Sequence, residues 1–203
     1  MPGLNFCTIN EHKSYKEYSE DFAIKVKSIN PETLDEVRLK KFEILKLNLQ
    51  RTSRLDKTFE PESETRELFS QINNPQQWIV LTETWCGDSA QIVPVIAKLA
   101  QLNSKIDLKI LLRDSNLDFM DLYLTNGGRA IPKLIVYDGN NEELFTWGPR
   151  PVAARDLFLK LKSEGMEKNE INKELHLWYG KNRGKEVEKE ITDQISLSIM
   201  HIK

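Results

Sequence analysis

Before residue 76, the apolar positions of the chain recur at helical intervals. The segment over residues 31–57 starts with a proline followed by acidic residues, as the first turn of a helix often does. Its apolar positions lie three to four residues apart: Leu39, Phe42, Leu45 and Leu49. This spacing predicts a long amphipathic helix. The stretch PESETRELFSQI predicts a shorter helix over residues 61–72, which the following NNP ends.

After residue 76 the pattern changes to short apolar runs separated by a helical segment. QWIVLTE, residues 77–83, is almost continuously apolar and β-rich, which is typical of a strand buried on both faces. Residues 88–102 follow as a helix, and IDLKILLRD, residues 106–114, predicts a second strand. A helix near residues 117–124 ends at NGG, where glycine suits a left-handed cap.

Two further apolar runs flank the turn sequence GNN. PKLIVYD, residues 132–138, and EELFTWG, residues 142–148, predict a β-hairpin, and residues 150–165 predict a helix with a glycine stop. The order is therefore strand, helix, strand, helix, hairpin, helix, which indicates an α/β fold. A strand–helix–strand unit implies a parallel pair with a right-handed crossover, and the hairpin adds antiparallel strands beside it.

The chain beyond Gly165 is strongly charged but retains two apolar stripes. The stripes consist of Ile171, Leu175 and Trp178, and of Val187, Ile191 and Ile195. Their spacing predicts two docked helices rather than a disordered tail. The stretch ISLSI near the end alternates at period two, so its secondary structure stays open.

Charge and hydropathy exclude several classes of function. The chain has 29 basic and 31 acidic residues, so no overall charge favours nucleic acid or anionic lipid. The N-terminus lacks the basic start and apolar stretch of a signal peptide, and the longest apolar runs are much shorter than a membrane span. We therefore expect a cytoplasmic protein that binds neither nucleic acid nor membranes.

Cysteine and histidine usage limits the chemistry further. Cys7 and Cys86 are the two cysteines, so no disulfide framework is built. A bridge between them is one interpretation, and an incidental Cys7 in the N-terminal segment is the other. The histidines, His12, His176 and His201, fit no metal-ligand spacing, and we expect no metal and no cofactor.

The sequence TETWCGDS places Cys86 between a buried strand and the first turn of a helix. Backbone N–H groups point outward there, and together with the helix dipole they favour a thiolate and hence a lowered pKa. Asp88 acts in the opposite direction, because a carboxylate disfavours a second anion nearby, so the sign of the net shift stays open. Glu83 and Asp88 could shuttle protons or could simply face solvent. Gly87 lets a partner chain approach the sulfur without meeting a side chain.

These residues and the order of elements resemble the thioredoxin family over residues 76–162. TWCGDS is similar to the family's Trp-Cys-Gly-x-Cys active site with the last cysteine replaced, and Pro94 is similar to the proline of its active-site helix. GGRAIPKLIVYD is similar to the segment with the family's cis-proline, which maps to the Ile131–Pro132 bond.

The resemblance implies a thioredoxin fold, a mixed central sheet of about four strands flanked by helices. Pro132 then packs beside Cys86, the Ile131 backbone is free to pair with an extended substrate, and Trp85 belongs to the surface that receives the partner. The candidate site consists of catalytic Cys86 and Ser89, with substrate contacts from Trp85, Gly87, Asp88, Ile131 and Pro132.

Two residues depart from the family's pattern and limit the chemistry that Cys86 can perform. Ser89 replaces the resolving cysteine, and Val80 replaces a buried acid that the family often carries. Ser89 can donate a hydrogen bond to a thiolate but cannot displace a thiol, so dithiol reduction is excluded and only an external thiol could release Cys86. One hypothesis is monothiol exchange with a protein thiol or disulfide, or with a low-molecular-weight thiol. The alternatives are a redox-inactive binding module, or Cys86 as a small buried residue.

The chain divides into three predicted parts. Residues 1–75 form an N-terminal helical extension packed on the core, residues 76–165 form the thioredoxin-like core, and residues 166–203 form a C-terminal helical extension. The extensions resemble additions in a bacterial branch of thioredoxin-like proteins. They cover an edge or face of the sheet, or they have a regulatory or partner-binding role.

Overall fold

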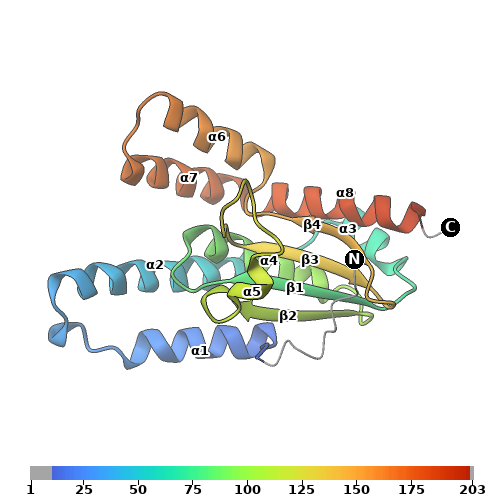
Figure 1. Ribbon diagram of the computed structural model, residues 1–203, viewed down its shortest axis with the longest axis horizontal. Helices are drawn as coiled ribbons and strands as arrows, with labels where there is room; N and C mark the ends of the chain where they lie inside the picture. Colours follow the sequence, from blue (N-terminus) through green and yellow to red (C-terminus); the bar gives the residue numbers. More distant parts are fainter. Residues whose placement is uncertain (1–10, 202–203) are drawn as a thin grey trace.

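The computed structural model describes residues 11–201 and shows a central sheet surrounded by helices (Figure 1). The strands are β1 (Gln76–Thr82), β2 (Ile106–Leu112), β3 (Lys133–Asp138) and β4 (Glu143–Trp147). The α-helices are α1 (Tyr15–Ser28), α2 (Glu36–Thr58), α3 (Ser63–Ser70), α4 (Gly87–Ala100), α5 (Leu117–Met120), α6 (Val152–Ser163), α7 (Lys168–Asn182) and α8 (Lys185–His201). Two short 3₁₀ helices are η2 (Pro31–Thr33) and η3 (Arg113–Ser115).

The sheet has the order β2-β1-β3-β4. β1 pairs with β2 in parallel, with Val80 opposite Ile110, while β3 is antiparallel to both β1 and β4. The predicted parallel pair and hairpin are therefore confirmed. Together with the surrounding helices, this mixed four-stranded sheet gives the thioredoxin-like α/β fold that the sequence predicts.

Alternate residues of β1 face opposite sides of the sheet, as the period of a strand requires. Trp78 and Val80 point into the larger core, which also contains apolar residues of α4, α7 and α8. Ile79 and Leu81 point into a smaller cluster on the other face, and that cluster includes Cys86. The candidate cysteine therefore lies at the edge of a packed apolar layer.

Helix α1 is absent from the sequence prediction. Ser14 and Glu17 form a capping box at its start, and Tyr18, Phe22 and Val26 make its buried stripe. Just ahead of the helix, Lys13 forms an isolated antiparallel bridge to β2, which covers part of that edge strand. Both the capping box and the four-residue apolar spacing are visible in the sequence.

The long N-terminal helix exists, but the predicted apolar stripe on it is partly wrong. Phe42 is buried, whereas Leu39 is exposed, and the stripe that faces the rest of the molecule continues through polar residues. The buried residues of α2 are Phe42, Asn48, Thr52 and Leu55. Asn48 and Thr52 are buried because their side chains donate hydrogen bonds to the carbonyls of Thr84 and Ala90.

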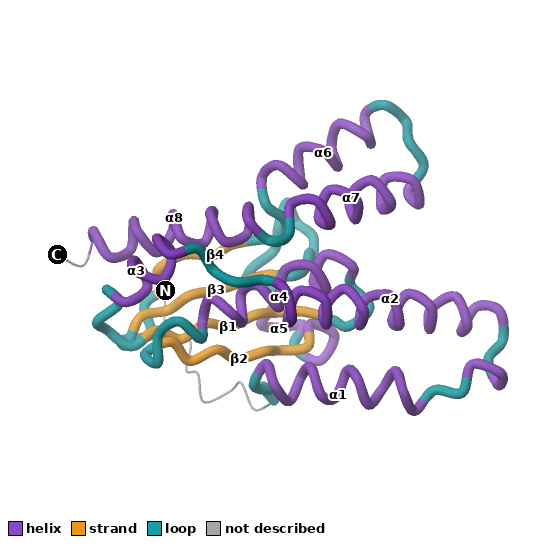
Figure 2. Tube along the Cα trace, turned by 180° about the vertical axis from the view of Figure 1, so that it is seen from behind, coloured by secondary structure: helices purple, strands orange, loops and turns teal. Residues whose placement is uncertain are grey.

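Two helical arms project beyond one end of the sheet. Figures 1 and 2 both show α1 with α2 as one arm and α6 with α7 as the other. Asn48 of α2 bonds to Thr84 in the loop between β1 and α4, and Tyr179 of α7 bonds to Asp88 in the first turn of α4. Helices α2 and α7 therefore meet around the candidate site.

The C-terminal helices form as predicted. Ile171 and Leu175 are buried in α7, but Tyr179 is the third buried residue of the stripe and Trp178 is only partly buried. ISLSI belongs to α8, so its period-two alternation does not make a strand. Over the described range of the chain, no helix combines enough length and apolar character to cross a membrane.

Candidate functional site

Cys86 is the N-cap residue of α4, four residues after the end of β1. Its backbone is extended, and its sulfur accepts a hydrogen bond from the backbone N–H of Ser89 at 3.4 Å. The side chain therefore takes the capping role that serine or aspartate usually fills. The thiol is free. Cys7 lies outside the described residues.

The segment before β3 meets the sulfur from the other side. The Cys86 thiol donates a hydrogen bond to the Ile131 carbonyl at 3.4 Å, and the Ile131–Pro132 peptide bond is cis. Gly148, at φ +109°, packs against this segment, since a Cβ on it would lie 2.4 Å from the Pro132 carbonyl oxygen. Glycine is required at this position by both the backbone angle and the close approach.

Cys86 is buried, with 9% of the residue exposed. Burial raises the pKa of the Cys86 thiol, and the Asp88 carboxylate raises it further. Hydrogen bonding from Ser89 lowers the pKa by less. The net direction, which the sequence left open, is therefore upward, and the thiol is the predominant form at neutral pH.

Asp88 is held by two residues that follow the sheet in the sequence. Its Oδ2 lies 2.7 Å from Arg150 Nη2 and 2.9 Å from Arg150 Nε, and its Oδ1 accepts a hydrogen bond from the Tyr179 hydroxyl at 2.9 Å. The Asp88 side chain is only 14% exposed. The interpretation of Asp88 as a solvent-facing carboxylate is therefore wrong, because this carboxylate joins the start of α4 to α7.

Glu83 is also buried rather than solvent-facing. Its Oε1 accepts a hydrogen bond from the backbone N–H of Asp114 at 2.9 Å, which joins the loop after β1 to η3. Burial raises the pKa of Glu83. This contact gives Glu83 a structural role in holding the loop.

The Ser89 hydroxyl is buried, and the described residues provide it with no hydrogen-bond partner. Its backbone N–H is bonded to the Cys86 sulfur, so the side chain is close to the thiol. An unpaired buried hydroxyl is unfavourable unless it gains a partner in another state of the site. A thiolate at Cys86 is a suitable acceptor.

Trp85 forms the exposed rim of the site, with 43% of the residue accessible. The Arg113 guanidinium lies over its ring, 4.8 Å from the centroid, and also donates a hydrogen bond to the Arg129 carbonyl at 3.1 Å. These contacts connect Trp85 to the segment that leads into Ile131.

Gly87 has a neighbour that local sequence reasoning did not find. A Cβ at this position would lie 2.8 Å from Nε2 of His176, so the space beside Gly87 is occupied by the ring of a residue on α7. The structure thus brings together all seven predicted site residues and adds Asn48, Arg150, His176 and Tyr179 around them. Their partners are far away in the sequence, and no local spacing indicates them.

Residues 11–201 contain no evident metal-binding site. No group of three or more histidine, cysteine, aspartate or glutamate side chains is arranged to hold a metal ion there.

Comparison with known proteins supports the fold. A family model described as Thioredoxin matches residues 42–168, which begins within α2 and ends at the start of α7. The crystal structure of a protein of unknown function, PA1234 from Pseudomonas aeruginosa, is similar with a TM-score of 0.55 and 20% identity, covering 93% of this chain and 98% of that one. A crystal structure of an HIV epitope scaffold is similar with a TM-score of 0.54 and 19% identity, covering 91% and 98%. Comparison with curated proteins gives no match.

Proposed function

The chain belongs to the thioredoxin family, and we propose that Cys86 performs thiol–disulfide exchange as a single cysteine. The observation that carries this proposal is the position of its sulfur. The sulfur caps α4 and lies 3.4 Å from the carbonyl that precedes the cis-proline. Helix-start N–H groups stabilise negative charge on a sulfur, which exchange requires.

Ser89 can stabilise a thiolate at Cys86, but it cannot perform the reaction of a second cysteine. When Cys86 loses its proton, the hydrogen bond to the Ile131 carbonyl is lost, and the unpaired Ser89 hydroxyl can donate to the thiolate instead. A hydroxyl does not attack a disulfide under these conditions, so Ser89 cannot release a bound partner.

The exchange has two steps. The Cys86 thiolate attacks one sulfur of a partner disulfide, a new S–S bond forms, the partner's S–S bond breaks, and the second partner sulfur leaves as a thiolate that takes a proton from water. A low-molecular-weight thiolate then attacks the partner sulfur of the mixed disulfide and expels Cys86 as a thiolate. The external thiol is thereby joined to the partner, and Cys86 returns to its starting state without a cofactor.

Two groups beside the sulfur suit an extended protein segment. Trp85 offers an exposed aromatic ring, and Ile131, although only 6% exposed, has a backbone N–H with no hydrogen-bond partner within the described chain. An extended segment could pair with that N–H as an added strand does. The proposal places the protein in a reducing compartment such as the cytoplasm, which supplies the external thiol.

The test uses a Cys7→Ser variant and a peptide joined to glutathione through a disulfide. We expect a mixed disulfide at Cys86, identified by mass spectrometry, and its release by added free thiol. The matched control is Cys7→Ser with Cys86→Ser, which forms none. Release of the peptide from glutathione at the same rate in the presence of either variant would refute exchange at Cys86.

A redox-inactive binding module is the second candidate, and the burial of the sulfur favours it. With 9% of Cys86 exposed and its pKa raised, the thiol is poorly accessible and mostly protonated. In a binding module of this kind, Trp85 and the Ile131 backbone contact the partner, and the Cys86 sulfur does not react with it. Capture of the same protein partner by wild type and by Cys86→Ala would support binding alone, whereas complete loss of capture in Cys86→Ala would exclude it.

A further inference from the structure

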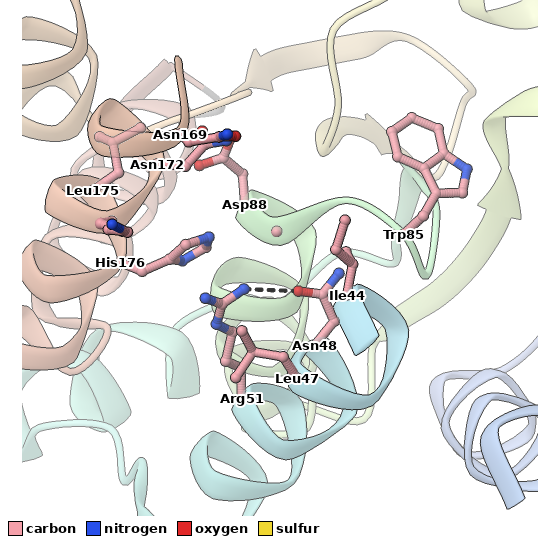
Figure 3. A pocket seen from close by; sticks show the side chains of 12 residues that line it. Ile44, Leu47, Asn48, Arg51, Trp85, Asp88, Asn169, Asn172, Leu175 and His176 are labelled. Atoms are coloured by element: carbon pink, nitrogen blue, oxygen red, sulfur yellow. Dashed lines mark hydrogen bonds between the residues drawn. The ribbon is translucent and has the colours of Figure 1, made fainter. Parts of the chain in front are cut away.

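A cavity of about 350 Å³ lies beside the cysteine motif, between α2 and α7 (Figure 3). The motif contributes Trp85, Gly87 and Asp88 to its wall. The volume falls within the usual range for small-ligand sites. Because α2 and α7 belong to the two extensions, this cavity exists only where both extensions meet the core.

Arg51 supplies an unpaired positive charge to this cavity. In Figure 3 its guanidinium group lies between Asn48 and His176, within the ring of lining side chains. Arg51 Nη1 donates a hydrogen bond to Asn48 Oδ1 at 2.9 Å, but within residues 11–201 no carboxylate lies within ion-pair distance of Arg51. Most of the five N–H donors of its planar group are left for another acceptor.

Arg51 remains charged despite its surroundings. Burial lowers the pKa of Arg51 to about 10, and the charge of nearby Arg54 contributes to this shift. At neutral pH the guanidinium is still protonated, so its positive charge is partly desolvated and lacks a close counter-ion. A bound anion would remove that cost.

The acid in the cavity wall is already paired. Both oxygens of Asp88 are engaged by Arg150 and Tyr179. Lys173, also in the wall, lies 2.6 Å from Glu170 on its own helix and is largely exposed. Lys173 carries the same charge as Arg51, and Asp88, which is paired with Arg150, raises the pKa of Arg51 by less than burial lowers it.

His176 adds a neutral N–H donor whose position follows from a chain of hydrogen bonds. Arg54 has only donors, so the Gln91 oxygen that it contacts at 3.0 Å must be the acceptor. The Gln91 amide nitrogen then donates to His176 Nδ1 at 3.4 Å, which leaves the proton of the neutral ring on Nε2. Burial and the Arg51 charge lower the pKa of His176 to about 4, so the ring is neutral at pH 7.

We propose that this cavity binds a carboxylate, held by the Arg51 guanidinium with the His176 and Asn48 side chains beside it. A planar guanidinium matches the two oxygens of a carboxylate, and the neutral imidazole adds a donor without competing for the anion. Ile44, Leu47 and Leu175 supply an apolar wall for the carbon part of the ligand. The carboxylate belongs either to a small organic acid or to an acidic side chain of a protein partner that enters between the arms. This site goes beyond thiol exchange, because its ligand contacts do not include the sulfur.

The test uses the full chain with Cys7→Ser and Cys86→Ser, so that loss of thiol exchange cannot affect the result. Glutarate and a capped Ala-Glu-Ala peptide are titrated separately while NMR follows the His176 ring and the Trp85 indole. We expect saturable shifts with at least one probe and none with capped Ala-Gln-Ala. Binding of glutarate alone identifies a small-acid site, and binding of the peptide identifies a partner side chain.

Variants of α2 make the assignment specific. Arg51→Gln should raise the Kd by about tenfold or more, as loss of a charge-assisted pair does. Lys57→Gln removes the same charge from an exposed position of the helix and should leave the Kd within about twofold. Urea unfolding verifies that each variant is folded. Absence of shifts at tens of millimolar probe, an unchanged Kd in folded Arg51→Gln, or tighter binding of inorganic phosphate than of either probe would overturn the proposal.

Discussion

His176 Nε2 lies 2.8 Å from the position that a Cβ atom would occupy on Gly87, so a residue of α7 packs directly on the turn that follows Cys86. Helix α7 is therefore part of the site. Asp88 strengthens the same connection through its bond to Tyr179. The integrity of the cysteine motif depends on residues of α7 that are far away in the sequence.

The Gly87–His176 contact predicts that Gly87→Ala lowers the free energy of unfolding by roughly 1–2 kcal/mol, because the ring must move from its place beside Gln91. Alanine is otherwise the better helix former, so the same change in a His176→Ala background should be neutral or stabilising. Urea unfolding of the four proteins of this double-mutant cycle measures the coupling. Equal effects of Gly87→Ala in both backgrounds would show that the contact has no energetic role.

Gly148→Ala should be far more damaging. The new Cβ would lie 2.4 Å from the Pro132 carbonyl oxygen at φ +109°, so we expect a loss of about 3 kcal/mol or more. Gly165→Ala is the matched control, since its φ is also positive at +76° but nothing lies within 4 Å of the added atom. Backbone strain alone should cost that variant about 1–2 kcal/mol. Similar unfolding energies for the two variants would argue against the close packing of Gly148.

Acidification should destabilise the protein through His176. The pKa of His176 is about 4 in the folded state and about 6.5 when unfolded, so the unfolded chain binds more protons between these values. Stability therefore falls as the pH is lowered from about 6.5 to 4, by on the order of 2 kcal/mol for this residue. His176→Gln should lose less stability over this range, whereas His12→Gln, at an exposed position, should follow the wild type. Parallel urea-unfolding profiles for His176→Gln and wild type would exclude this effect.

Asp88→Asn should lower the pKa of Cys86, because the Asp88 carboxylate raises it. The variant also leaves Arg150 without its partner, which we expect to cost roughly 2–3 kcal/mol since both side chains are mostly buried. Alkylation of Cys86 as a function of pH, in a Cys7→Ser background, measures the first effect. Asp156→Asn breaks a surface pair with Arg155 and serves as the control. A Cys86 profile unchanged by Asp88→Asn would mean that the carboxylate does not influence the sulfur.

Local pattern was sufficient for the centre of the sheet because β1 and β3 are nearly continuous apolar runs. QWIVLTE and PKLIVYD could hardly form anything other than buried strands, and the GNN turn identified the hairpin. Helix α1 was missed although Ser14 and Glu17 form a capping box, because its buried apolar positions are few and are separated by charged residues.

The contacts that complete the site could not be predicted in this way. Tyr179 and Asp88 are 91 residues apart, and Arg150 and Asp88 are 62 apart. The spacing of α2 indicated an apolar stripe, yet Asn48 is fully buried because its side chain bonds to the Thr84 carbonyl. The pKa of Cys86 likewise depends on burial by the segment around Ile131, which the first turn of α4 does not specify.

The most direct measurement is the rate of mixed-disulfide formation at Cys86 as a function of pH, using the Cys7→Ser variant and the glutathione-linked peptide. We predict slow exchange at neutral pH and a rate that rises to a plateau with a midpoint above about 8.5, the ordinary pKa of a thiol. We also predict a higher midpoint for Ser89→Ala, because this variant loses a hydrogen bond that lowers the pKa of Cys86. Absence of a mixed disulfide at Cys86 across the whole pH range, in a folded protein, would contradict single-cysteine exchange.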